Sequence, residues 1–295
     1  MNDGKRPLLA ALSLALAGCL WGTGFLFGKI AFREMTVSEN VAFRFLAGTI
    51  ALSPILFRRW RIYRPKDFLL VLIAAVIGVP LQFLVQFKGL ESTTVSHASL
   101  IVGSLPVLLA LGSALFLSER LHYLEWGVLT LSAIGAVLIA LSGRSQMTGP
   151  QPSLRGDVLV LLSMFAAVAM ILSSKRLVER YDSLHVTATI ISLGTIMIFI
   201  WVELSQPLRF HFSLRTWTAV LAQGLLATAG AHLGWNWGLA HIPASRASVF
   251  LNLEPVVGAF LGVLVLHERL GKMAFLGGTL IVSAAVYFSR RSHQT

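Results

Sequence analysis

The sequence predicts an all-α integral membrane protein with ten transmembrane helices, arranged as two inverted-topology repeats of five helices each. Three observations predict this fold: the composition, a series of long apolar runs, and a repeat between the two halves of the chain. Hydrophobic residues make up 56% of the 295 residues and charged residues only 13%, and the mean hydropathy is +0.76. A soluble domain of this length carries more polar surface than that.

The apolar runs have the length that a helix needs to cross ~30 Å of hydrocarbon at 1.5 Å per residue. Lys5 and Arg6 precede the first run, which is too long for the core of a signal peptide, so we expect it to be the first span. The predicted spans are Leu8–Phe32, Val37–Phe57, Phe68–Phe87, Val95–Leu117, Leu124–Leu141, Val158–Ser174, His185–Leu204, Trp217–Leu239, Ala244–Leu266 and Met273–Phe288.

The two halves of the chain resemble each other. Residues 98–121 and 247–270 align without a gap at an offset of 149. We therefore expect one five-helix unit over 1–142, a connecting loop over 143–156 and a second unit over 157–295. Because five is odd, the second unit enters the membrane upside down, as in transporters that alternate access around a site at the midplane. The aligned pairs include Ala98 with Ala247, Pro106 with Pro255, and Glu119-Arg120-Leu121 with Glu268-Arg269-Leu270.

The formal net charge is +11, but the basic residues gather at the ends of apolar runs, as at Arg58, Arg59 and Arg61. This placement suits a cytoplasmic membrane surface rather than a nucleic acid. In the first half, the loops on the side of the N-terminus hold 8 Lys and Arg residues, and the opposite loops hold 3. We therefore expect a multi-pass protein of the bacterial inner membrane with both termini in the cytoplasm.

Signs of catalysis and of bound cofactors are missing from the sequence. Cys19 is the only cysteine, which excludes a disulfide within the chain and a cysteine metal cluster. There is no His-Glu-x-x-His or Gly-x-Ser-x-Gly pattern and no paired aspartate in a span. We expect no catalytic residue, no metal and no cofactor. The expected partners are a small solute and the lipid bilayer; the oligomeric state stays open, and a monomer is compatible with the sequence.

The eighth predicted span has two distinct faces. Three glycines at spacing four form a smooth stripe, which lets another helix approach closely. Polar and aromatic side chains gather on the opposite face and predict a cavity wall, with hydrogen bonding between helices as the alternative. The stripe is Gly230, Gly234 and Gly238, and the opposite face carries Thr228, His232, Trp235 and Asn236.

Other spans add candidate substrate-binding residues, although packing or hydrogen bonds between helices would explain them equally well. In-helix prolines in the fourth and ninth spans each remove a backbone donor, which predicts a hinge or a static kink. Glu254 is interpreted as a support of the kink, with a coupling proton as the alternative. Arg44 is interpreted as a partner of a substrate carboxylate, with a place near the helix end as the alternative. The candidates are Trp21, Gln82, Gln86, Ser99, Ser248 and Asn252, and the prolines are Pro106 and Pro255.

These residues carry a resemblance to a known family. Leu20-Trp21-Gly22 with Phe25, the mid-span prolines and the duplicated Glu-Arg-Leu tripeptides resemble the drug/metabolite transporter (DMT) superfamily, EamA type. Trp235-Asn236-Trp237-Gly238-Leu239, followed by Ala247-Ser248, resembles bacterial aromatic amino-acid exporters of the YddG type. The resemblance implies an inner-membrane exporter of small metabolites, foremost amino acids. The alternatives are a carrier of phosphorylated metabolites such as nucleotide sugars and, in another class, a membrane-embedded enzyme.

Overall fold

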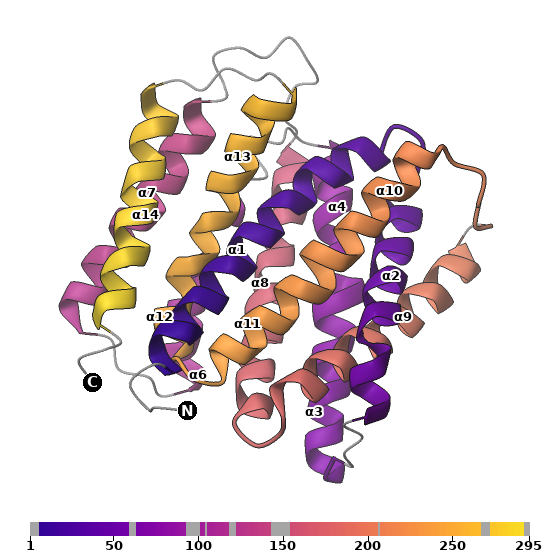
Figure 1. Ribbon diagram of the computed structural model, residues 1–295, viewed down its shortest axis with the longest axis horizontal. Helices are drawn as coiled ribbons and strands as arrows, with labels where there is room; N and C mark the ends of the chain where they lie inside the picture. Colours follow the sequence, from indigo (N-terminus) through magenta and orange to yellow (C-terminus); the bar gives the residue numbers. More distant parts are fainter. Residues whose placement is uncertain are drawn as a thin grey trace.

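The computed structural model describes residues 6–58, 63–92, 101–103, 105–117, 122–142, 154–205, 207–266 and 272–291, and in these residues the secondary structure is entirely helical (Figure 1). The helices of the first half are α1 (Arg6–Ala31), α2 (Val37–Arg58), α3 (Pro65–Val76), η2 (Ile77–Leu81), α4 (Gln82–Ser92), α6 (Leu105–Phe116) and α7 (Tyr123–Ser142). Those of the second half are α8 (Leu154–Val178), α9 (Ser183–Ser205), α10 (Leu214–Ala222), η4 (Gln223–Gly230), α11 (Ala231–Leu239), α12 (Ala244–Ala247), η5 (Ser248–Asn252), α13 (Leu253–Leu266) and α14 (Lys272–Arg291).

Nine of the ten predicted apolar runs coincide with these helical segments to within a few residues. Of the run Val95–Leu117, residues 95–100 and 104 lie outside the described residues. Within the described residues, five segments are long and apolar enough to cross a membrane: Arg6–Ala31, Val37–Arg58, Pro65–Ser92, Val158–Val178 and Ser183–Ser205. Leu105–Phe116 and Phe275–Ala284 are shorter apolar helices. The membrane protein predicted from composition is therefore an apolar helical bundle, and the count of ten spans remains a prediction.

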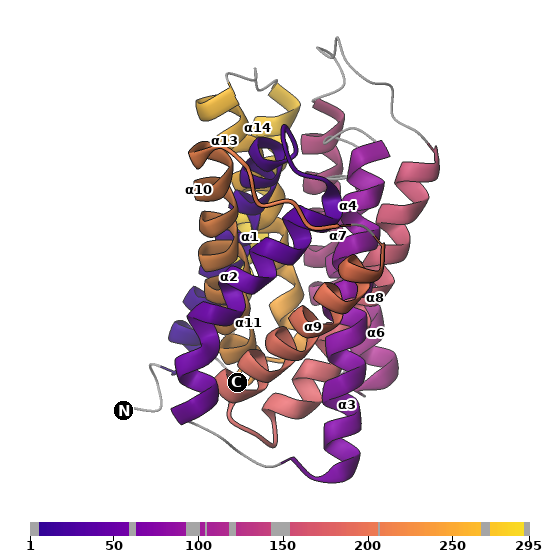
Figure 2. The same cartoon turned by 90° about the vertical axis from the view of Figure 1, so that its right-hand side faces the viewer.

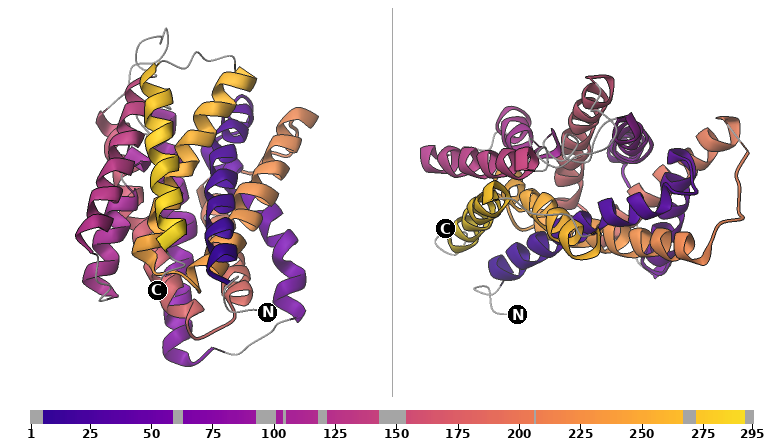
Figure 3. Two further views of the ribbon diagram at one scale, coloured as in Figure 1. Left: turned by 60° about the vertical axis from the view of Figure 1, so that its left-hand side comes forward. Right: turned by 90° about the horizontal axis from the view of Figure 1, so that it is seen from above.

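The helices pair across the two halves of the chain. α7 lies beside α14 at one edge of the bundle, and α1 crosses one face next to α11 and α13 (Figure 1). Figure 2 shows α4 alongside α8, and α2 packs on α9. Seen from above, the magenta α7 and the yellow α14 lie side by side at one edge of the bundle (Figure 3). The start of α1 and the end of α14 lie at the same end of the bundle.

Glycines let α1 approach two neighbours closely. A Cβ atom added to Gly18 would lie 2.3 Å from the carbonyl oxygen of Phe250, and one added to Gly22 would lie 2.6 Å from that of Glu254. On its other side α1 meets the glycine stripe of η4 and α11, where a Cβ on Gly238 would lie 2.6 Å from the side chain of Leu14. The close helix contact predicted from the glycine stripe is confirmed, and α1 is the helix that makes it.

Two of the long helical segments contain a π-helical stretch. η2 interrupts the segment from Pro65 to Ser92, and η4 interrupts the segment from Leu214 to Leu239. The repeat offset of 149 carries Ile77 and Leu81 to positions 226 and 230, which lie inside η4. The two deviations from α-helical geometry therefore sit at matching places in the two halves, and π-helical turns are frequent near functional sites.

We predict that Gly18→Ala destabilises the protein and that Gly278→Ala does not. Alanine normally stabilises a helix by ~0.5–1 kcal/mol relative to glycine, but at Gly18 the new methyl group collides with the backbone of η5. Overpacking of this kind costs about 1–3 kcal/mol. A Cβ atom on Gly278 has no neighbour within 4 Å. Thermal unfolding of the purified protein in detergent should show a lower midpoint for Gly18→Ala only, and equal midpoints would contradict the close contact.

Candidate functional site

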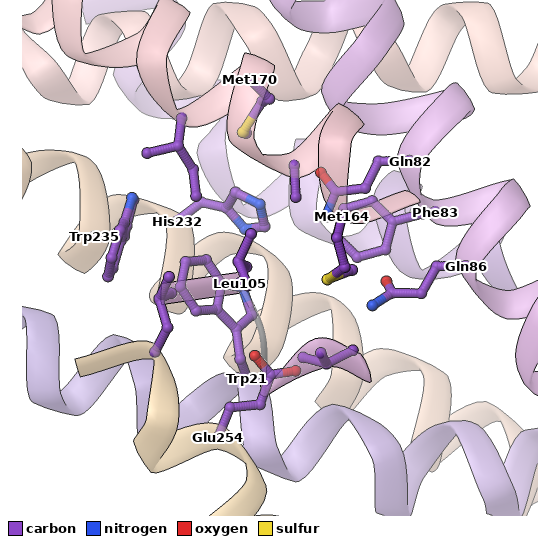
Figure 4. Close-up of a pocket in the computed structure, with 14 residues that line it drawn as sticks. Trp21, Gln82, Phe83, Gln86, Leu105, Met164, Met170, His232, Trp235 and Glu254 are labelled. Carbon is purple, nitrogen blue, oxygen red and sulfur yellow. The ribbon is translucent and has the colours of Figure 1, made fainter. Parts of the chain in front are cut away.

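A cavity lies between helices of the two halves (Figure 4). It has about 540 Å³ of empty volume, part of which is open. The first half contributes residues from α1, α4, α6 and the residue Val102, and the second half contributes residues from α8, α11, η5 and α13. The lining residues are Trp21, Gln82, Phe83, Gln86, Val102, Leu105, Met164, Ala167, Met170, Ile171, His232, Trp235, Leu251 and Glu254.

Two indole rings and an imidazole form one wall of this cavity. The ring centroid of Trp21 lies 5.3 Å from that of His232, edge to face, and 5.3 Å from that of Trp235. Trp235 is 2% exposed, and its Nε1 donor has no hydrogen-bond partner within the described residues. A buried indole N–H normally finds an acceptor. The wall therefore offers flat apolar area to the cavity, and the buried Nε1 of Trp235 is a donor without a partner in the described part of the chain.

His232 is held in a defined orientation by its own helix. Its Nδ1 donates a hydrogen bond of 2.8 Å to the carbonyl oxygen of Thr228, because a carbonyl oxygen can only accept. In the neutral ring Nε2 is then an acceptor. Gln82 and Gln86 line the cavity from α4, one helical turn apart, and each amide can both donate and accept. The cavity thus combines an aromatic wall with groups that bind polar atoms of a solute.

α8 contributes a side of the cavity that the sequence analysis did not identify. Met164, Met170 and Ile171 line it together with Ala167. A thioether side chain is flexible and polarizable, and it adapts to ligands of different shape. These residues lie in the stretch 164–172, which carries no polar side chain, so no sequence pattern distinguishes them from lipid-facing or core residues. The two methionines are the one sequence feature that could have pointed to a cavity on this helix, and methionine is also common in ordinary helix packing.

A second, smaller pocket adjoins the first and shares four of its lining residues: Trp21, Phe83, Gln86 and Glu254. Arg44 lines this side pocket from α2 and is 2% exposed. Its Nε donates a hydrogen bond of 3.2 Å to Oγ1 of Thr228.

Three rings surround the guanidinium of Arg44. The guanidinium carbon lies 4.8, 5.1 and 5.5 Å from the ring centroids of Phe83, Phe45 and Phe87, respectively. At these distances the rings form cation–π interactions with the guanidinium, and such interactions stabilise a buried cation. Arg44 and Glu254 are far apart in the sequence, and the fold brings both to one pocket.

Three predicted binding residues do not line the cavity, because neighbouring helices or their own backbone use their polar groups. Asn236 donates a hydrogen bond of 2.8 Å to Thr187 of α9. The hydroxyl of Ser248 donates to the carbonyl oxygen of Ser245, and the amide of Asn252 donates to Ser132 of α7. In this structure these side chains connect helices or satisfy the backbone, and their role as substrate ligands stays a prediction. Ser99 lies outside the described residues.

The prolines lie near the starts of α6 and α13. Pro106 is the second residue of α6, and Pro255 is the third residue of α13. α13 continues the 3₁₀ segment η5 without a break in the helical backbone, so Pro255 lies inside the longer helical stretch from Ala244 to Leu266. The predicted interruption in the ninth span is present as η5, and a role in bending stays a prediction.

Within the described residues, no group of three or more His, Cys, Asp and Glu side chains could hold a metal ion. The polar groups of the cavity are few and of mixed chemistry, set in an apolar and aromatic wall. Sites of this composition bind small organic molecules.

Comparisons with known proteins agree with this arrangement. The chain is 28% identical over 289 residues to an uncharacterized transporter of Archaeoglobus fulgidus, covering 96% of this chain and 98% of that one. It is 24% identical to the uncharacterized transporter YetK of Bacillus subtilis, covering 94% and 86%, and 26% identical to a probable biotin transporter of Pseudomonas aeruginosa, covering 90% and 92%. A solved crystal structure with 19% identity superposes with a TM-score of 0.79, covering 94% of this chain and 96% of that chain, which shows a shared fold.

The sequence profile of the EamA-like transporter family matches this chain twice, over residues 8–141 and 154–290. The two matches together cover most of the chain, and the relatives aligned along nearly its full length are named as transporters. The cavity lies between helices of the two matching segments. This chain belongs to the EamA-like transporter family, and it is a multi-pass membrane transporter of small metabolites.

Proposed function

We propose that the protein is an inner-membrane exporter of amino acids, including aromatic ones, that works by alternating access around the central cavity. In this proposal ten transmembrane helices form two inverted five-helix units, over 1–142 and 157–295, and both termini lie in the cytoplasm. Trp21, Gln82, Gln86, His232 and Trp235 contact the solute. The kinship with exporters of the YddG type inferred from the motif around Trp235 belongs to the proposal as well.

The composition of the cavity wall is the observation that carries this proposal. Trp21 and Trp235 meet at one side, and Met164 and Met170 line another, so the wall matches a flat apolar side chain. The amides of Gln82 and Gln86 and the imidazole of His232 can bind polar atoms of the same solute. Lining residues from both halves favour a rocking of one half against the other, with the interrupted helix at η5 next to the bending point.

The relative that is named a probable biotin transporter supplies a second candidate substrate. Biotin is a monocarboxylate whose aliphatic chain leads to a fused ureido and thiophane ring, so it shares a carboxylate and an apolar part with an amino acid but lacks the ammonium group. A phosphorylated metabolite fits less well, because Arg44 is the only basic side chain among the residues that line the two pockets, apart from the imidazole of His232. Exchange of radiolabelled solutes in liposomes that hold only the purified protein separates these classes.

We predict that Trp235→Leu weakens competition by tryptophan and phenylalanine about three- to tenfold in this exchange assay, because an aromatic pair contributes ~0.5–1.5 kcal/mol beyond its buried area. Competition by alanine should stay within twofold of the parental protein. Trp237→Leu is the matched control, since Trp237 lies on the same helix and does not line the cavity. Equal losses for alanine and tryptophan, or equal effects of the two variants, would contradict contact between Trp235 and the solute side chain.

The proposed topology is checked with reporters. A fluorescent protein that folds only in the cytoplasm should give signal when it is fused after Thr295, because the even number of spans returns the chain to its starting side. The same protein inserted between Gly149 and Pro152 should stay dark, because that loop follows five spans. Signal from the loop insertion and none from the C-terminal fusion would contradict the charge distribution as the determinant of orientation.

A further inference from the structure

The side pocket contains one basic and one acidic side chain in the interior of the bundle. Arg44 reaches it from α2 and Glu254 from the first turn of α13, so the two residues come from different halves of the chain. Both residues are described by the structure, and they form no ion pair within 4.0 Å. A guanidinium and a carboxyl group thus face one pocket without a direct contact.

This separation is unfavourable unless the space between the charges is used. Two buried charges are stabilised when they form a direct, hydrogen-bonded ion pair, and an open gap gives up much of that attraction. Within the described residues, the only side-chain hydrogen bond of Arg44 uses Nε, which leaves its terminal nitrogens as donors toward the pocket. Figure 4 shows the carboxyl group of Glu254 next to Trp21, at the edge of the larger cavity.

We propose that Arg44 and Glu254 form a clamp for a zwitterion, in which Arg44 binds the α-carboxylate of an amino acid and Glu254 binds its α-ammonium group. The side chain of the amino acid then lies in the larger cavity, against Trp21, Trp235 and the methionines of α8. Because Glu254 lines both pockets, the charged end and the apolar end of one solute meet at this residue. The assignment rests on the proposed function and names the residues that select its substrate class.

The residues around Arg44 and Glu254 suit the binding of a carboxylate by the first and of an ammonium group by the second. The rings of Phe45, Phe83 and Phe87 keep the guanidinium of Arg44 away from water and fix its position, and Thr228 holds its Nε. A guanidinium held in this way presents its remaining nitrogens as a fork, which matches a carboxylate. His232 is the other titratable side chain of the larger cavity, and its Nδ1 is engaged by the carbonyl of Thr228. Glu254 is therefore the anionic side chain available to an ammonium group among the residues that line the two pockets.

The first test needs no variant. Liposomes that hold the purified protein exchange radiolabelled phenylalanine, and three competitors are compared: phenylalanine, phenylalaninamide, which lacks the carboxylate, and 3-phenylpropionate, which lacks the ammonium group. A competitor that lacks either charged group should compete about tenfold less well or worse, because the missing group can no longer form its charge-assisted hydrogen bond in a desolvated site. Equal competition by the three compounds would overturn the clamp.

The second test assigns each charge to its residue. Arg44→Gln should reduce the advantage of phenylalanine over phenylalaninamide to less than threefold and keep its advantage over 3-phenylpropionate. Glu254→Gln should reduce the advantage of phenylalanine over 3-phenylpropionate to less than threefold and keep its advantage over phenylalaninamide. Lys88→Gln is the control for loss of a charge, since Lys88 is exposed at the end of α4 and pairs with Glu91, and it should keep both advantages.

The outcomes separate the two proposals. If folded protein exchanges no amino acid at all, the proposed function is wrong and the clamp falls with it. If phenylalanine is exchanged but both variants retain both preferences, the proposed function stands and the clamp is overturned. If Arg44→Gln does not fold, Arg44→Lys retains the charge, and the comparison of competitors on the parental protein still decides whether both charged groups of the solute are recognised.

Discussion

The close approach of α1 to α11 on one side and to η5 and α13 on the other is the constraint on which the site depends. Helices in a membrane gain little from burying apolar surface against each other, so their association relies on packing. At Gly18 and Gly22 backbone meets backbone, and at Gly238 the side chain of Leu14 fills the place of the missing Cβ atom. This packing fixes Trp21 between the two neighbours, where its ring meets His232 and Trp235. A wider spacing of these helices would separate the aromatic wall from the carboxyl group of Glu254.

Much of the fold follows from the sequence, because hydrocarbon permits few alternatives. Apolar runs of the right length become helices, since a backbone in lipid must satisfy its own hydrogen bonds. Charged residues and prolines mark the helix ends, so the predicted run Ala244–Leu266 matches the segment from α12 to α13. The interruption of that segment by η5 was expected from Pro255. The π-helical segments η2 and η4 were not expected, because no residue pattern distinguishes a π-helical turn from an α-helical one.

The candidate site was predictable where a polar or aromatic side chain stands out in an apolar span, as at Gln82, His232 and Trp235, which all line the cavity. Asn236 also stands out, yet its amide bonds to Thr187 of α9. Sequence alone cannot separate these cases, because the difference lies in the neighbouring helix rather than in the residue. The reverse holds for Met164 and Met170, which look like ordinary core and still face the cavity. Arg44 and Glu254 are 210 positions apart, so only the fold reveals that they share a pocket.

The matched π-helical segments also determine which residues the two long helices present to the cavity. A π-helical turn is equivalent to one extra residue inserted into an α-helix, and one residue corresponds to about 100° of rotation. Deleting one residue from η4 would turn all of α11 relative to α10, so that His232 and Trp235 would leave the cavity. The same turn would carry Gly234 and Gly238 away from α1, where they now face Ser13 and Leu14. The extra residue of η4 therefore sets, at the same time, which side chains line the cavity and which face of α11 packs on α1.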